Sequence, residues 1–128
     1  MADTRFTNRE LDVMSVLWRN GSGTVGEVRE ALEDKLAYTS VLWVLQTLDE
    51  KGFVRHTREG RAHRYYPVVE QHEAGAGAID RLVEKVFHGS AVLLARLVSE
   101  RDISTEELKE MRDLLDRRIA ELQKRKKK

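Results

Sequence analysis

The fold of this chain is decided by residues 39–67, which read TSVLWVLQTLDEKGFVRHTREGRAHRYYP. In the first part of this stretch, apolar residues recur at the three- and four-residue spacing of an amphipathic helix. The predicted helix runs from about Thr39 to Lys51 and stops at Gly52, a good C-terminal cap. Its expected core stripe consists of Val41, Val44, Leu45 and Leu48.

The second part of the same stretch is rich in aromatic, β-branched and basic residues, which indicates a β-hairpin. Its predicted strands are residues 53–58 and 62–66, and the turn is Glu59-Gly60, in which Gly60 supplies a positive φ. With a two-residue loop, basic residues face one another: Arg58 faces Arg61, and His56 faces His63. Because like charges on opposed strands repel, this arrangement predicts that the hairpin receives an anion.

Capping boxes mark the starts of three further helices, at Thr7-Asn8-Arg9-Glu10, Thr24-Val25-Gly26-Glu27 and Ser104-Thr105-Glu106-Glu107. In such a box a hydroxyl accepts from a backbone N–H and a glutamate reaches back. The first of these helices continues to Asn20-Gly21. Beyond residue 70 the whole chain is predicted to be helical, with three apolar stripes at helical spacing.

The composition limits the class of protein. A chain of 128 residues forms one folding unit or two small ones, and a net charge of +1 does not by itself indicate nucleic-acid binding. The absence of cysteine excludes disulfides, Cys-based zinc sites and thiol catalysis. No long apolar run and no charged-then-apolar leader is present, so we expect a cytoplasmic protein without a membrane span.

Motifs for catalysis or metal binding are also missing. The sequence has no nucleophile elbow, no Gly-rich phosphate loop and no His-Glu-x-x-His pattern, so we expect neither enzyme activity nor a cofactor. His56 and His63 form a possible metal pair if they oppose each other directly. Two ligands without a third clear donor are too few for a good site, so no metal is predicted.

Three short helices followed by a basic hairpin are the element order of a winged helix-turn-helix. In this fold class, mainly α with a small β-hairpin wing, the third helix presents its polar face to the DNA major groove. We therefore expect a DNA-binding domain over residues 1–70 and a helical dimerisation region over residues 71–128. The latter closes with a basic tail, Lys124-Arg125-Lys126-Lys127-Lys128.

Several motifs follow one another in order: Leu11–Trp18, Thr24–Val28, Ala37–Leu42, Leu48–Val54 and Gly60–Pro67, and then Val86–Ser90, Ser104–Leu108 and Leu114–Asp116. Together they closely resemble the penicillinase-repressor and methicillin-resistance-repressor family of bacterial transcription factors. The resemblance covers nearly the whole chain. It implies a homodimeric repressor with an N-terminal winged helix and a C-terminal helical dimerisation region. It also implies a pseudo-palindromic operator, in this family typically built on TACA and TGTA.

The chain departs from the family pattern at two kinds of position. Family members often have Thr at the place of Trp43 and Arg at the place of Thr47, so the family operator is not carried over unchanged. In well-known members a sensor protease cuts an Asn-Phe bond in the C-terminal region, and this sequence has no Asn-Phe pair. The copper-responsive branch uses C-terminal cysteine pairs, which are absent here, so that route is dropped.

The candidate site residues lie on the third helix, on the hairpin and in the apolar stripes of the second half. Gln46 suits bidentate pairing with adenine, and short hydroxyls suit phosphate or thymine-methyl contacts. The candidate DNA-binding residues are Tyr38, Thr39, Ser40, Trp43, Gln46, Thr47, Arg58, Arg61 and His63. The candidate dimerisation residues are Leu82, Val86, Phe87, Leu94, Leu97, Leu108, Met111, Leu115, Ile119 and Leu122.

Four aromatic residues carry individual expectations. Trp18 sits in an apolar stripe and is predicted to pack in the core. Trp43 is offset from the core stripe, which is equally consistent with facing DNA and with packing against the wing or the first helix. Tyr65 and Tyr66 alternate along a strand, so one is expected in the core and the other at the surface.

Two other functions stay open on the sequence alone. Winged helices also serve as protein–protein assembly adaptors, and the near-zero net charge leaves room for that class. DNA binding that weakens steeply with salt distinguishes the repressor from the adaptor, because each neutralised phosphate releases counterions. A second alternative keeps DNA binding and adds a small-molecule sensor pocket between the two regions, although no polar cluster marks one.

Overall fold

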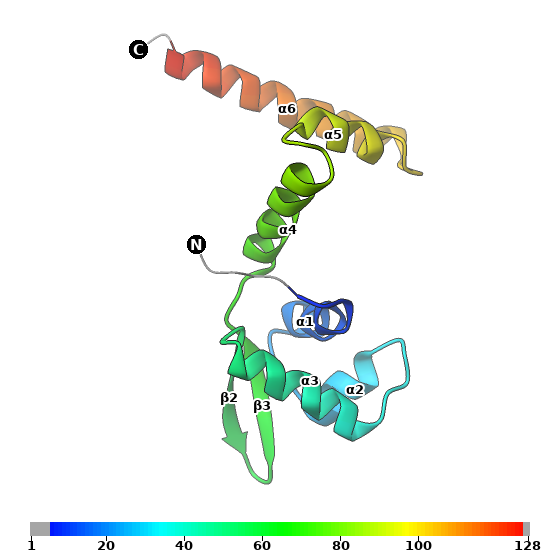
Figure 1. The fold of residues 1–128 in the computed structure, drawn as a ribbon, viewed down its shortest axis with the longest axis vertical. Coiled ribbons are helices and arrows are strands. Elements are labelled where there is room, and N and C mark those ends of the chain that lie inside the picture. Colours follow the sequence, from blue (N-terminus) through cyan, green and yellow to red (C-terminus); the bar gives the residue numbers. More distant parts are fainter. Residues whose placement is uncertain (1–5, 127–128) are drawn as a thin grey trace. The chain divides into compact units, whose positions relative to one another are not determined.

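A computed structural model describes residues 6–126 of the chain. The chain divides into two compact units, Met1–Arg81 and Leu82–Lys128, and the division falls within a helix. The predicted fold class, mainly α with a small β-hairpin wing, is confirmed (Figure 1). The elements are α1 (Asn8–Asn20), β1 (Gly23–Thr24), α2 (Val25–Ala31), α3 (Tyr38–Glu50), β2 (Val54–Glu59), β3 (Ala62–Pro67), α4 (Gln71–Lys85), α5 (Ala91–Ser99) and α6 (Thr105–Lys126).

Helices α1 and α2 begin where their capping residues satisfy the free backbone N–H groups. The hydroxyls of Thr7 and Thr24 accept from the N–H groups of Glu10 and Glu27, whose carboxylates accept in return from the N–H groups of the two threonines. Both predicted capping boxes are thus confirmed. Helix α1 ends at Gly21, where φ is +86°, a left-handed conformation that glycine adopts without steric cost.

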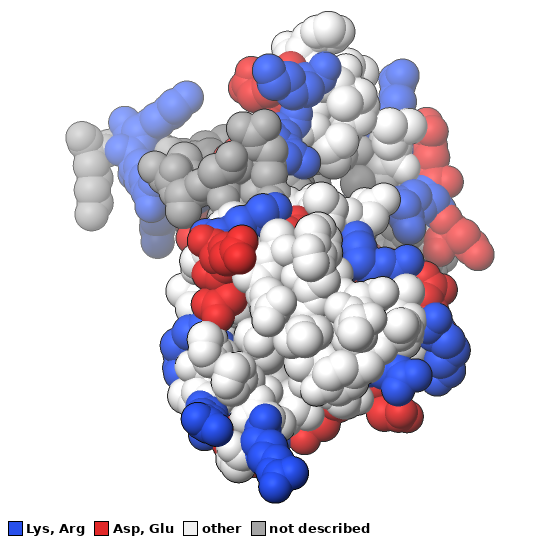
Figure 2. Space-filling view, turned by 60° about the horizontal axis from the view of Figure 1, so that its bottom comes forward, with Lys and Arg blue, Asp and Glu red and all other residues white. Residues whose placement is uncertain are grey.

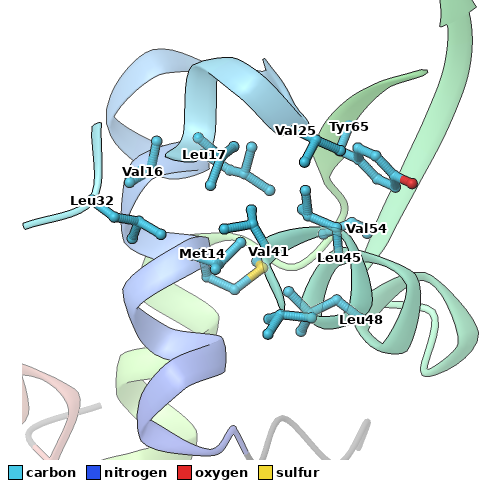
Figure 3. Close-up of a cluster of buried hydrophobic side chains, with 13 residues drawn as sticks. Met14, Val16, Leu17, Val25, Leu32, Val41, Leu45, Leu48, Val54 and Tyr65 are labelled. Carbon is cyan, nitrogen blue, oxygen red and sulfur yellow. The ribbon is translucent and has the colours of Figure 1, made fainter. Parts of the chain in front are cut away.

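The core of the first unit lies between α1, α2 and α3, with Val54 and Tyr65 added from the hairpin (Figure 3). The predicted stripe of α3 is buried, and its four side chains are 0–5% exposed. Tyr65 is buried, which confirms the predicted core tyrosine, whereas Tyr66 is half-buried and not fully at the surface as expected. Trp18 lies at the edge of the core rather than inside it, and its indole Nε1 donates to the Val69 carbonyl oxygen at 2.8 Å.

The sheet has three antiparallel strands in the order β1-β3-β2, which confirms the hairpin but corrects its register. The turn residues are Gly60 and Arg61, so the predicted pairing of Arg58 with Arg61 and of His56 with His63 is wrong. Gly60 has φ +61° and takes the first of the two turn positions, as glycine does in hairpins whose turn matches the strand twist. The observed pairs are Glu59 with Ala62, Arg58 with His63, Thr57 with Arg64, and His56 with Tyr65.

The second unit is helical but encloses no core of its own. Among the described residues of α5 and α6, none is buried. Ser104 precedes α6 and its hydroxyl accepts from the N–H of Glu107 at 3.1 Å, the first half of the predicted capping box. Helix α6 extends to Lys126, whereas Lys127 and Lys128 of the predicted basic tail lie outside the described residues. Within residues 6–126, no helix combines the length and apolar character needed to span a membrane.

Candidate nucleic-acid interface

The outward face of α3 carries most of the residues predicted to read DNA. Tyr38 is 48% exposed and Trp43 is 67% exposed, and Thr39, Ser40 and Gln46 are exposed as well. The exposure of Trp43 speaks against its packing against the wing or α1, and its contact with DNA stays a prediction.

Thr47 differs from the other candidates on α3. Its side chain is half-buried, and its hydroxyl donates to the carbonyl oxygen of Trp43, one helical turn earlier, at 2.8 Å. A hydroxyl whose proton is used within the helix is a weaker donor to a base or a phosphate. Thr47 therefore contributes less to the outward face than the sequence suggested.

The N-terminus of α3 differs from those of α1 and α2. Its N-cap residue is Ala37, whose methyl side chain carries no hydrogen-bonding atom. The Ser40 N–H donates to the Ala37 carbonyl oxygen at 3.0 Å, so the N–H groups of Tyr38 and Thr39 are the ones left for solvent or a ligand. Such groups favour phosphate because the helix dipole adds to their positive character. The hydroxyls of Thr39 and Ser40 lie in the same turn.

The wing presents arginines along its two strands. Arg58, Arg61 and His63 are all exposed, as predicted for residues that meet an anion. Arg58 Nε donates to the Gly60 carbonyl oxygen at 3.3 Å, which holds its guanidinium near the turn. Arg55 lies with its guanidinium carbon 4.3 Å from the centre of the Tyr66 ring, a cation–π contact.

Arg64 is a wing residue whose charge is paired with carboxylates of the same protein. Its guanidinium donates to both carboxylate oxygens of Glu27 at 2.9 and 3.0 Å, to Glu59 at 2.5 Å and to the Ser22 hydroxyl at 3.2 Å. The hydrogen bonds from Arg64 lower the pKa of the Glu27 carboxyl. The hydrogen bonds to Glu27 and Glu59 raise the pKa of the Arg64 guanidinium. The hairpin is thereby tied to the first turn of α2, which fixes the wing relative to the helices.

An open groove separates α3 from the wing. Within it His56 Nδ1 lies 2.5 Å from Asp49 Oδ2, and the rings of His56 and His63 stack with centroids 4.7 Å apart. The two histidines meet because diagonal neighbours on one face of a sheet are within reach of aromatic rings. The groove is lined by Gln46, Asp49, Glu50, His56, His63 and Tyr65. It therefore has one DNA-binding candidate from α3, Gln46, and one from the wing, His63. Among residues 6–126, no three His, Asp or Glu side chains are grouped as metal ligands.

Another ion pair anchors the C-terminal end of α3. Lys51 Nζ lies 2.8 Å from the carboxylate of Glu10, whose side chain is 5% exposed. Burial alone would raise the pKa of Glu10, but the hydrogen bonds from Lys51 and from Thr7 outweigh it, so the pKa is lowered. This pair joins the C-terminal end of α3 to the first turn of α1 and makes α3 a rigid support for its outward side chains.

The charge pattern of this end of the molecule is visible from the side of the wing and of α2 and α3 (Figure 2). A broad zone without charged residues is bordered by lysines and arginines, with acidic residues in smaller groups. An uncharged centre with a basic border fits a surface that contacts base edges in the middle and phosphates at its margin.

Eight of the ten candidate dimerisation residues lie on α4, α5 and α6, whereas Val86 and Phe87, predicted to be helical, lie in the turn after α4. Phe87, Leu94 and Met111 are half-buried. The other seven are exposed, between 37% for Leu108 and 58% for Leu115: Leu82, Val86, Leu97, Leu108, Leu115, Ile119 and Leu122.

Sequence reasoning missed the roles of Arg64, Lys51 and Ala37. The partners of Arg64 and Lys51 are 37 and 41 residues away in the chain, and no local pattern points to them. The missing cap of α3 had a readable signal, because Ala37 stands where α1 and α2 have threonine.

Known proteins resemble this chain along most of its length. The chain matches the penicillinase repressor family over residues 6–117. A transcriptional regulator BlaI of Mycobacterium tuberculosis (strain H37Rv) is 44% identical over 91 residues, which are 68% of this chain and 66%, just under two thirds, of that relative. The methicillin resistance regulatory protein MecI of Staphylococcus aureus (strain N315) is 21% identical over 115 residues, which cover 88% of this chain and 94% of that protein.

A solved structure supports the same relationship. The solution structure of the DNA-binding domain of the repressor BlaI matches with a TM-score of 0.50 and 27% sequence identity, over 56% of this chain and 89% of that domain. The resemblance inferred from the sequence motifs is confirmed. Because the family match extends over most of its length, the chain belongs to the penicillinase repressor family, a family of transcriptional repressors.

Proposed function

We propose that this protein is a sequence-specific transcriptional repressor that binds a pseudo-palindromic DNA operator as a homodimer in the cytoplasm. The observation that carries the proposal is the exposed outward face of α3, which carries no charged residue from Tyr38 to Thr47, next to a wing with exposed Arg58 and Arg61. An α-helix fits the major groove of B-DNA, and arginines beside it suit the flanking phosphates. Repression then follows from occlusion of the promoter.

The helical region of residues 71–128 is proposed to hold the dimer together. Ten large apolar side chains of the second unit are at least 37% exposed: Leu82, Val86, Val92, Leu93, Leu97, Leu108, Leu114, Leu115, Ile119 and Leu122. Covering the exposed half of such a side chain contributes about 1 kcal/mol. Two copies together then supply at most about 20 kcal/mol, against which the loss of rigid-body freedom and the ordering of side chains are set. A two-fold dimer also matches the symmetry of a palindromic operator.

Salt dependence tests the proposed DNA contact. A duplex selected from a random pool with the full-length protein is bound at several salt concentrations, and the slope of log affinity against log salt is measured. Arg61→Ala is expected to weaken binding about equally on all sequences and to reduce the slope by about 0.9, the contribution of one phosphate. Arg117→Ala on the exposed surface of α6 is the matched control and should leave the slope unchanged.

Base reading is expected to lie on α3. Gln46→Ala should relax the preference at one operator position by roughly 1–3 kcal/mol if Gln46 pairs bidentately with adenine. Uniform weakening on all sequences would make Gln46 a positioning residue. Failure of the wild-type protein to enrich any sequence, together with binding of a protein partner, would instead favour an assembly adaptor.

A further inference from the structure

Trp43 is the most exposed large apolar side chain described in the first unit, at 67%. The other tryptophan of the chain, Trp18, packs against the core and bonds through its indole N–H to Val69. Covering an exposed indole is strongly favourable, because a large aromatic side chain removes more apolar area from water than a smaller side chain does. Tryptophan is enriched at interfaces, so an indole this exposed on the candidate reading face favours contact with a partner.

Trp43 also occupies the centre of the outward face of α3. Successive residues of an α-helix are about 100° apart around its axis. On this spacing Thr39 and Gln46 lie on one side of Trp43. Ser40 and Thr47 lie on the other side. The buried stripe of α3 faces nearly the opposite way, so the indole projects from the middle of the face that would enter a groove.

The major groove offers one kind of group that an apolar ring can cover favourably. Base edges present hydrogen-bond donors and acceptors there, and the C5 methyl group of thymine is their one apolar feature. The carbon framework of Trp43 offers apolar area and no charge, and the hydroxyl of Thr47 on the same face is bonded to the carbonyl oxygen of Trp43 itself. A methyl group is therefore the complement that this position fits.

We propose that Trp43 selects thymine in the operator by covering the C5 methyl group of one thymine in each half-site, beside the base pair that Gln46 contacts. The inference rests on the proposed DNA-binding function and adds the chemical identity of one recognised group. It assigns to Trp43 an apolar contact, whereas the polar neighbours on the same face supply hydrogen bonds.

The test replaces thymine by uracil, which lacks only the methyl group and pairs with adenine through the same atoms. In the selected operator duplex, each thymine of a half-site is changed to uracil in turn, together with its symmetry mate. For the wild-type protein, one such change is expected to lower the affinity about fourfold per half-site, the effect of leaving one methyl-sized apolar group uncovered. The Trp43→Ala variant should bind the thymine and uracil duplexes equally at that position.

Two further variants complete the design. Trp43→Phe keeps an apolar ring and should retain most of the discrimination, and Leu11→Ala, which removes an exposed apolar side chain of α1, should leave it unchanged. Circular dichroism checks that each variant is folded. If wild type and Trp43→Ala respond to uracil alike at every position while the operator is still bound, the thymine assignment is overturned and the DNA-binding function stands. If no duplex is bound by the wild-type protein, both are overturned.

Discussion

The two units of this molecule solve the burial of apolar residues in different ways. In the first unit, three helices and a small sheet enclose Val13, Met14, Leu17, Leu45 and Leu48, all at 0% exposure. In the second unit, the helices carry leucines at the same helical spacing, yet none of the described residues of α5 and α6 is buried. The comparison teaches that an apolar stripe does not by itself define a core. A stripe needs facing elements, and among the described residues the helices of the second unit do not supply them to one another.

The strongest test of this difference is a core substitution in the first unit. Leu17→Ala should lower the free energy of unfolding by about 2–5 kcal/mol, because the cavity it leaves in a packed core is only partly filled by relaxation. Denaturant unfolding followed by circular dichroism measures the change. Leu11→Ala on the same helix is the control and should cost well below about 1 kcal/mol, since Leu11 is 40% exposed. Equal losses at both positions would contradict the assigned core.

The corresponding substitution in the second unit should act on assembly instead of folding. Leu115→Asp places a charge in the apolar stripe of α6 and is expected to reduce operator affinity at least about 100-fold, because each protomer then binds its half-site alone. Ala120→Asp introduces the same charge on α6 outside the stripe and should have little effect. Fluorescence anisotropy with a labelled operator measures both variants. A Leu115→Asp protein with wild-type affinity would show that the stripe does not couple the two half-sites.

A smaller effect is expected at Arg64, which ties the wing to the rest of the first unit. Arg64→Ala should reduce operator affinity about tenfold, which corresponds to the loss of one hydrogen bond to a charged group. Because the role assigned to Arg64 is to position the wing, its effect should disappear largely in an Arg61→Ala background. A double-mutant cycle measures this coupling. Strictly additive losses would mean that Arg64 does not act through the wing turn.

The smallest effect is a pH dependence at Glu10. Its pKa is lowered in the folded protein, so the ion pair with Lys51 stabilises the fold above the ordinary pKa of 4.5 and this stabilisation is lost as the pH falls below it. Glu10→Gln should therefore be less stable than wild type at pH 7, and the difference should shrink between about pH 4.5 and the onset of acid unfolding. Thermal unfolding at a series of pH values tests this. A stability difference that stays constant with pH would show that the ion pair between Glu10 and Lys51 is not its cause.

Much of the first unit was predictable because its signals are local. The capping boxes at Thr7 and Thr24 and the stripe of α3 each depend on residues within a few positions, and all three are confirmed. The hairpin register was not, since moving the turn by one residue shifts every cross-strand partner by two. A shift of two residues keeps every side chain on the same face of the sheet, so the burial of Val54 and Tyr65 fits both registers and does not choose between the two turns.

The candidate site was predictable to the extent that it follows from helix geometry. The outward placement of Tyr38, Trp43 and Gln46 follows from the buried stripe of the same helix. The internal use of Thr47 and of Arg64 did not follow from the sequence, because a side chain that bonds to its own protein looks the same in a sequence as one left for a ligand.

The most direct test of the central claim, that the second unit pairs two copies on a palindromic operator, is sedimentation equilibrium of the full chain at micromolar concentration, alone and with the selected duplex. We predict a dimer alone, two protomers on each duplex, and a monomer for Leu115→Asp under the same conditions. A full-length protein that sediments as a monomer and still binds the palindrome with full affinity would contradict the claim.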